Sequence, residues 1–333
     1  MVVVLYYHRY LKIISPLILT SALTSTLTTP VYGESLGVAV RSIEQALAIA
    51  TLMSDSEALT FGFANVDLEV EDPGFGNEKS TNLKNSLDVF VIPYTWDLEP
   101  KSKAWDHAIT VRAFYIASKR DSQLFSDVSD KLKQNTYGIY GNYSQFYHIT
   151  KQWYVTSALG AHLSYYKNSY SYGEGFPEET KAELDNIAFN VTTLALIAEP
   201  EVGIGYERDE QWGKWRAHNQ INYIYGHGLS GSIDKPSNIN PEGWRITNGV
   251  EFTVNVPELW GVNDFITVDF KRIDLMGDLE AMADNGYYYE TTIGWVIDTQ
   301  DKIPFLDNIG IGLSVNYGSS ISGATLVLYW NEE

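Results

Sequence analysis

The sequence contains no cysteine, which excludes disulfide bonds, thiolate metal sites and cysteine nucleophiles. Basic residues are also scarce, because 23 lysines and arginines stand against 42 aspartates and glutamates, for a formal net charge of −19. Nucleic acid is recognised through basic patches that neutralise phosphates, so this balance argues against a nucleic-acid partner. It also argues against attraction of the chain as a whole to an anionic membrane surface.

Long hydrophobic runs are missing as well. The apolar stretch 13–23 is about eleven residues long, whereas a membrane-spanning helix needs about twenty. It follows a basic N-terminal segment, and Val31 and Gly33 occupy the −3 and −1 positions of a cleavage site. We therefore predict a signal peptide over residues 1–33, cut between Gly33 and Glu34; a buried core helix is the alternative. An exported chain without long apolar runs can cross a membrane only with strands, as a closed barrel.

Aromatic residues, by contrast, are plentiful at 14% of the chain, and 26 glycines accompany them, while the mean hydropathy is only −0.17. A transmembrane β-barrel has such a composition, because apolar lipid-facing residues alternate with polar residues in the lumen. Composition alone also fits a soluble β-sandwich or propeller.

Alternation of apolar and polar residues separates these possibilities. From Ile309 to Tyr317, every second residue is apolar and the others are small or polar, so one face of a strand would be wholly apolar. Most strands predicted in this way exceed ten residues, whereas strands of soluble proteins average five or six. The pattern predicts strands at about 58–67, 86–98, 104–118, 134–147, 152–166, 190–207, 213–226, 243–256, 262–273, 285–298, 306–318 and 321–330.

The predicted connections alternate between long and short along most of the chain, and aromatic residues recur near strand ends. Both features are typical of Gram-negative outer-membrane barrels, which have long outer loops, short periplasmic turns and aromatic girdles at both interfaces. We therefore expect an all-β fold, a transmembrane antiparallel β-barrel of about twelve strands over residues 58–333, located in the cell outer membrane. Both chain ends would then lie on the periplasmic side.

One segment departs from this pattern. Residues 35–56 carry apolar side chains at helical spacing and predict a short α-helix ahead of the barrel, within an N-terminal segment 34–57. A helix of about 22 residues spans about 33 Å, enough to plug a barrel of membrane height, although a polar, glycine-rich lumen suits an apolar helix poorly. The alternative is that the helix packs its apolar stripe at the periplasmic mouth.

A helix followed by about twelve strands, the last of them the aromatic-rich Ile321–Trp330, resembles the translocator domain of autotransporters. More narrowly, the chain resembles the solitary autotransporter-like barrels of the outer membrane, which carry no passenger, and segment 199–206 is similar to their mid-barrel strands. The short stretch between Gly33 and the first strand leaves no room for a passenger. Residues 35–57 contain no Asn at which self-cleavage, common among autotransporters, would occur.

This resemblance implies a narrow porin-like pore, or a structural or surface protein. Its partners would be outer-membrane lipid, lipopolysaccharide and, during biogenesis, the barrel-assembly machinery. The sequence leaves the oligomeric state open.

Charged residues on the polar strand faces are the candidate functional residues. They would be costly in lipid but not in a wet lumen. They either line a pore and set its ion preference or form a structural network that fills a narrow barrel, and both possibilities stay open. The lumen-lining candidates are Arg112, Arg216, His218, Arg245, Glu251, Asp269, Lys271 and Glu290.

The alternative function is a lipid-modifying enzyme of the outer membrane. His162 and Ser164 have a His-x-Ser spacing similar to that of lipid A deacylases. They share the polar face of a predicted strand, however, and would point into the lumen, away from a lipid substrate. We therefore expect no catalytic residues, no cofactor and no bound metal ion.

Processing can be tested directly. The mature protein is expected to begin at Glu34, because the short apolar segment leads to a small-residue cleavage site. N-terminal sequencing of the protein from the outer-membrane fraction measures this, and retention of residues 1–20 would contradict it.

Overall fold

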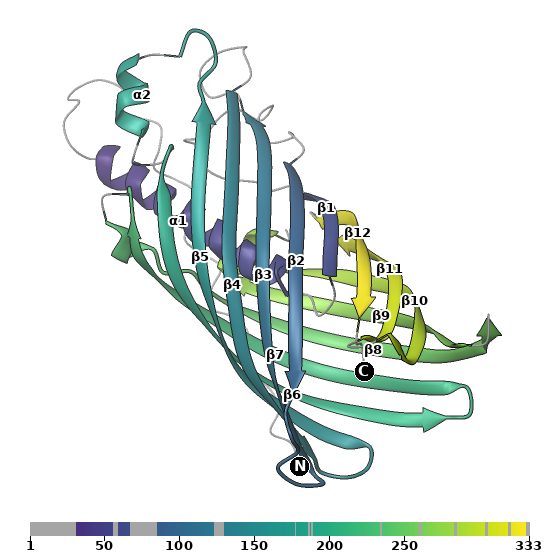
Figure 1. Ribbon diagram of the computed structural model, residues 1–333. Coiled ribbons are helices and arrows are strands. Elements are labelled where there is room, and N and C mark those ends of the chain that lie inside the picture. Colours follow the sequence, from purple (N-terminus) through teal and green to yellow (C-terminus); the bar gives the residue numbers. More distant parts are fainter. Residues whose placement is uncertain are drawn as a thin grey trace, which may run out of the picture.

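In the computed structural model, the chain forms a closed antiparallel barrel of twelve strands with an α-helix inside it (Figure 1). The strands follow one another around the barrel in chain order, and β1 closes against β12. This confirms the expected fold class. The structure describes residues 31–55, 59–66, 85–122, 130–176, 178–185, 187, 189–233, 235–259, 262–282, 285–303, 306–318 and 321–330.

All twelve predicted strands are present. They are β1 (Leu59–Val66), β2 (Asn85–Asp97), β3 (Trp105–Ser122), β4 (Asp130–His148), β5 (Trp153–Ser171), β6 (Thr192–Glu210), β7 (Gly213–Gly231), β8 (Glu242–Leu259), β9 (Val262–Gly277), β10 (Tyr287–Ile303), β11 (Leu306–Gly318) and β12 (Ile321–Trp330). The helical elements are α1 (Val31–Met53), the short α2 (Glu178–Leu184) and two 3₁₀ turns, η1 (Pro236–Asn238) and η2 (Asp278–Met282).

Several strands run further than the sequence predicts at the long-loop end of the barrel. β5, for example, continues to Ser171, and the β3–β4 hairpin continues to the pair Ser122 and Asp130. The added residues are mostly polar on both faces, so apolar alternation could not show that they pair. The short elements α2, η1 and η2 were not predicted, because they lie in the long loops and are too short to display a helical stripe.

The strands alternate between a lipid face and a lumen face as predicted. On β11, Ile311, Leu313 and Val315 point outward and are exposed, whereas Ser314 is buried on the lumen side. On β4, the outward residues Tyr137 and Tyr147 lie ten positions apart. At about 3.4 Å per residue and a tilt near 40°, this separation spans about 25 Å, the height of the apolar band of an outer-membrane barrel.

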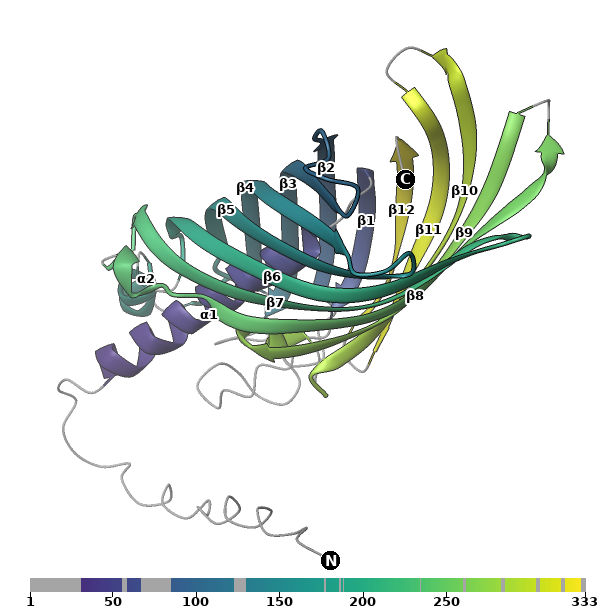
Figure 2. The same cartoon turned by 90° about the horizontal axis from the view of Figure 1, so that it is seen from below.

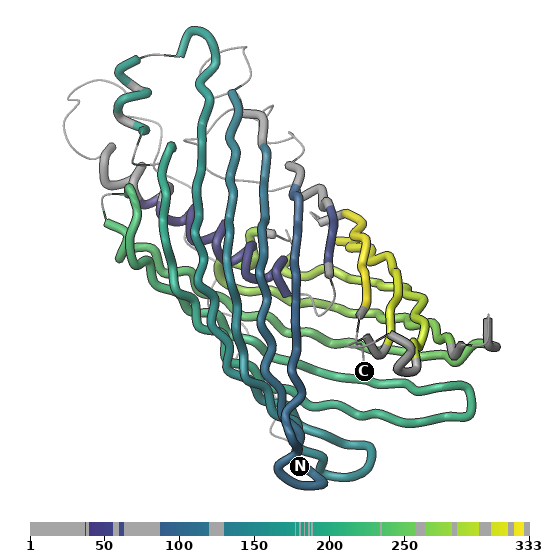
Figure 3. Tube along the Cα trace, in the orientation of Figure 1, coloured from purple at the N-terminus to yellow at the C-terminus, as the bar shows by residue number. Residues whose placement is uncertain are grey.

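The wall of the barrel differs greatly in height from one side to the other (Figures 1 and 3). β4, β5, β6 and β7 contain 19 residues each, whereas β1 contains 8 and β12 contains 10. The tall side therefore rises beyond the apolar band at the long-loop end, while the short side barely spans it.

Helix α1 enters the barrel from the long-loop end, along the inner face of the tall wall (Figure 2). There the Glu44 carboxylate accepts a hydrogen bond from the Asn240 backbone amide at 2.7 Å, and the helix lies against η2. β12 finishes at the opposite end, so the two ends of the described chain are separated by the barrel height. The chain ends themselves lie outside the described residues, so the expectation that both lie on the periplasmic side stays a prediction. The described helix runs through the lumen instead of packing at the short-turn mouth.

The helix begins at Val31, so it runs across the predicted cleavage site between Gly33 and Glu34. Cleavage there would remove only the first residues of α1 and would leave its buried part, which begins at Ile43, intact. Among the described residues, no helix combines the length and apolar character needed to cross a membrane.

The lipid face can be tested at Leu313, which lies between Ile293 of β10 and Leu326 of β12 in the middle of the outward surface. Leu313→Arg is expected to destabilise the barrel by about 2–4 kcal/mol, because it places a cation in the apolar band. Ser171→Arg, on the exposed end of β5, is the control and should cost under about 0.5 kcal/mol. Denaturant unfolding in liposomes measures both variants; equal costs would contradict the assigned lipid face.

Candidate functional site

The long-loop half of the lumen is apolar and closes around α1. Ile43, Leu47, Ala48 and Ala50 of the helix are almost fully buried. They pack against lumen-facing residues of the wall, including Leu87, Val89, Phe114, Ile116, Ile197, Ile273 and Leu275. Each fully buried Leu or Ile side chain contributes about 1.5–3 kcal/mol, so this stripe alone binds the helix firmly to the wall.

The long-loop end of the helix is fixed by a polar contact, in which Glu44 accepts a hydrogen bond from the Asn240 amide. Close to the helix, Asp278 of η2 accepts a hydrogen bond from the Glu242 amide at 2.8 Å. Burial raises the pKa of the Glu44 carboxyl, and it also raises the pKa of the Asp278 carboxyl. Both carboxyls therefore bind a proton more readily in the folded chain than in water, because burial disfavours their charged form.

The inner end of the helix finishes on Asp55. The last turn is held by hydrogen bonds from the Ser54 amide to the Ala50 carbonyl and from the Asp55 amide to the Leu52 carbonyl, of 3.0 and 3.2 Å. A carboxylate at this position faces the negative end of the helix dipole and needs cations to offset the repulsion.

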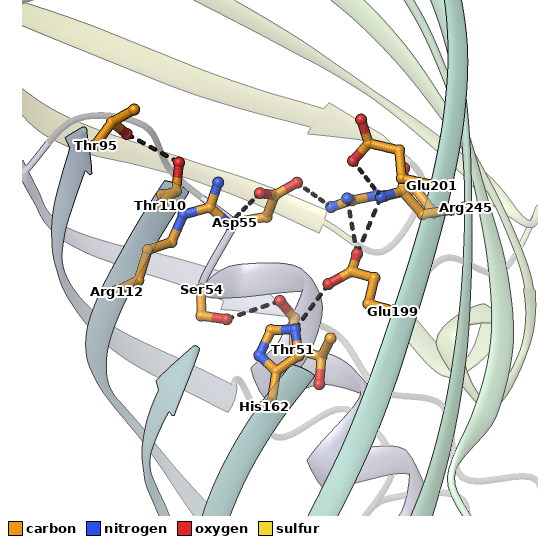
Figure 4. A network of polar contacts seen from close by, with 11 residues as sticks. Thr51, Ser54, Asp55, Thr95, Thr110, Arg112, His162, Glu199, Glu201 and Arg245 are labelled. Atoms are coloured by element: carbon orange, nitrogen blue, oxygen red, sulfur yellow. Dashed lines mark hydrogen bonds and ion pairs between the residues drawn. The ribbon is translucent and has the colours of Figure 1, made fainter. Parts of the chain in front are cut away.

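Two arginines supply this positive charge. Arg112 Nη1 lies 2.5 Å from Asp55 Oδ1, and Arg245 Nη1 lies 2.5 Å from Asp55 Oδ2, so each carboxylate oxygen binds one guanidinium (Figure 4). Arg112 belongs to β3 and Arg245 to β8, which are separated around the barrel by four strands. The Asp55 carboxylate therefore joins two opposite walls through the lumen.

A buried network continues from Arg245 into the tall wall. Its Nη2 lies 3.1 Å from Glu199 Oε1, and Glu199 Oε2 lies 2.7 Å from His162 Nε2. The Asn222 amide donates to Glu199 and to Glu201, at 3.1 and 3.0 Å. The side chains of Glu199 and His162 are only 4% and 0% exposed, so each depends on its partners for compensation of its polar groups.

Aromatic rings pack closely around this network because glycines on the facing strands leave space for them. The Tyr140 ring lies 4.3 Å from the His162 ring, and the Arg112 guanidinium lies 4.8 Å from the Tyr140 ring centre. A Cβ at Gly160 would collide with Tyr140. Glycine at this position is thus required by the close approach of the ring.

The structure divides the eight predicted lumen residues between two regions. Arg112 and Arg245 bind the helix end, as described above. On the short-turn side of Arg245, Arg216 pairs with Glu251 at 2.6 Å, and Lys271 pairs with Asp269 at 2.5 Å and with Glu290 at 3.6 Å. His218 lies against Gly249 of the neighbouring strand. Charged side chains line this part of the lumen, and none of these ion pairs includes a residue of α1.

Asp55 was not predicted as the residue that joins the two regions, and the pair of His162 with Glu199 was not predicted either. A signal for Asp55 was available, because an Asp at the end of an otherwise apolar helix is unfavourable unless a cation meets it. No local pattern indicates that the cations come from β3 and β8.

The His162 and Ser164 side chains do not form a hydrolytic pair in this structure. Both are fully buried beside the lumen, and neither His162 Nδ1 nor Ser164 Oγ has a hydrogen-bond partner. No hydrogen bond therefore links the hydroxyl to the imidazole, as a nucleophile and base require. Among the described residues, no group of three or more His, Asp or Glu side chains could hold a metal ion.

The contribution of the Asp55 anchor can be measured with Asp55→Asn, which leaves two buried guanidinium groups without this carboxylate. We expect a loss of about 2–3 kcal/mol, below the roughly 3–5 kcal/mol of a fully buried pair, because the Asp55 side chain is 27% exposed. Hydrogen exchange in α1 should accelerate accordingly. Glu251→Gln is the control, because it breaks a more exposed ion pair; it should cost at most about 1 kcal/mol and leave α1 unaffected. Unchanged hydrogen exchange of α1 in Asp55→Asn would contradict the role of Asp55 in holding the helix.

Comparison with solved structures finds the same architecture in autotransporters. The transport unit of the autotransporter AIDA-I from Escherichia coli aligns with a TM-score of 0.53 at 13% identity, over 92% of this chain and 100% of that chain. The translocator domain of NalP from Neisseria meningitidis aligns with a TM-score of 0.47 at 8% identity, over 90% and 98% of the two chains. The likeness to the AIDA-I transport unit concerns the fold alone.

No functionally curated protein matches the chain. The profile of the family described as "Solitary outer membrane autotransporter beta-barrel domain" matches residues 44–332, from the buried part of α1 to the end of β12. This match confirms the resemblance inferred from the order of the elements. The chain therefore belongs to the family of solitary outer-membrane autotransporter β-barrel domains.

Proposed function

We propose that this protein is a narrow outer-membrane pore held closed by its own N-terminal helix. The observation that carries the proposal is the position of α1, whose apolar stripe seals the long-loop half of the lumen and whose Asp55 binds Arg112 and Arg245 from opposite walls. The charged lining of the other half supports a water-filled vestibule, because such pairs are stable in a wet lumen but not in lipid.

We also propose an orientation in which the long loops face outward and β12 ends on the periplasmic side. Long outer loops and short periplasmic turns are the usual arrangement of bacterial outer-membrane barrels. In this orientation, the helix enters the lumen from the outer side, and the N-terminal end of the mature chain lies outside.

The function proposed for this protein is not enzymatic. The strongest enzymatic alternative, a lipid A deacylase-like hydrolase using His162 and Ser164, finds little support, since both side chains are buried under the plug and face away from lipid. A lipid substrate approaching from the membrane would meet the opposite, apolar face of β5.

Planar-bilayer recording tests the plug. Deletion of residues 34–55 is expected to raise single-channel conductance several-fold, because it empties the apolar half of the lumen, and Asp55→Asn is expected to increase the frequency of openings. Glu251→Gln is the control, because Glu251 lines the lumen without binding the helix.

Heat-modifiable gel migration must be retained in every variant to show that the barrel is folded. Unchanged conductance of the folded deletion variant would overturn the proposed plug. A wild-type barrel that already conducts at the level of the deletion variant would overturn it as well.

A further inference from the structure

Four lysines gather on the outward face of the tall wall, at the long-loop ends of β3, β4 and β5. This lysine strip consists of Lys119, Lys131, Lys133 and Lys167, all of them exposed. They come from a chain with only 23 basic residues and a net charge of −19, so their concentration on one face runs against the overall charge.

The strand register brings the four ammonium groups close together. Lys119 of β3 lies directly opposite Lys133 of β4, with Cβ atoms about 4.5–5.5 Å apart for such pairs. Lys131 follows two positions along β4, on the same face. Lys167 of β5 lies opposite Asn135 and is thus a diagonal neighbour of Lys133, at about 7–8 Å.

A nearby carboxylate compensates only part of this charge. Asp88 Oδ2 lies 3.6 Å from Lys119 Nζ. In the described part of the chain, Lys133 and Lys167 have no ion-pair partner. Like charges directly opposite each other destabilise a strand pair, so the arrangement favours an anion that binds from outside.

The strip lies at the height of lipid headgroups. Tyr115, Tyr137 and Tyr165 form the outward aromatic row of the same three strands, with the first two rings stacked at 4.8 Å. Along each strand, the lysines lie two to six positions closer to the long-loop end than the tyrosine does. Aromatic girdles mark the membrane interface, so the ammonium groups lie just beyond it.

We propose that the lysine strip binds the phosphate groups of a phosphorylated glycolipid in the outer leaflet, the chemistry of lipid A in lipopolysaccharide. Phosphate carries up to two negative charges and relieves the repulsion between Lys119 and Lys133, while the acyl chains lie along the apolar face below the tyrosines. The site rests on the proposed outward orientation of the long loops but not on whether the lumen conducts.

Binding of bisphosphorylated lipid A to the refolded full chain in detergent tests the proposal. The double variant Lys133→Gln/Lys167→Gln is expected to weaken binding about 10–30-fold, since each lysine at a membrane surface contributes about 1 kcal/mol. The matched control, Lys103→Gln/Lys151→Gln, removes two exposed lysines at the short-turn end and should change affinity less than twofold. Dephosphorylated lipid A should bind the wild-type chain as weakly as bisphosphorylated lipid A binds the strip variant.

Heat-modifiable migration of both variants confirms that they fold. Equal weakening by the two double variants would overturn the proposal, because it would show an effect of net charge alone. Unchanged affinity in the strip variant would overturn it, and so would competition by inorganic phosphate or phosphatidylglycerol micelles at the same concentration as lipid A. Because conductance is not measured here, failure of this test leaves the proposed plug intact.

Discussion

The carboxylate of Asp55 is the contact on which the arrangement of this barrel depends. Its two oxygens bind guanidinium groups from β3 and β8, which face each other across the lumen. Burying two guanidinium groups is costly unless carboxylates compensate their charge, and an acidic residue at the end of a helix is itself unfavourable. The three charges therefore stabilise one another only when the helix is inside a closed barrel.

This contact divides the lumen into an apolar region and a charged region. On the long-loop side, apolar side chains of α1 and the wall form a packed core, like the interior of a soluble protein. On the short-turn side, Arg216, Glu251 and Lys271 line the wall in pairs that remain partly exposed. Asp55 lies at the boundary, where it follows the packed apolar part of α1 and its side chain keeps 27% exposure.

Alternation along each strand was enough to predict the number, order and facing of the strands, because a two-residue period is a local property. The upper lumen was harder to predict, since Leu87, Val89 and Ile116 make both faces of their strands apolar near the long loops, and a polar lumen was assumed. The network of Asp55, Arg245, Glu199 and His162 could not be predicted, because four separate elements meet across a lumen whose diameter and register no single segment encodes.

The short seam between β1 and β12 has a consequence for assembly. Every other strand pair joins neighbours in sequence, whereas closure must bring Leu59 against Leu328 with only eight residue pairs. Such a closure is entropically slow, because the chain ends must find each other. Asp55 lies four residues before Leu59, so a helix already bound to β3 and β8 confines the first strand to a small volume beside its place in the wall. The helix thus acts as a template that converts the last ring closure into a nearly local step.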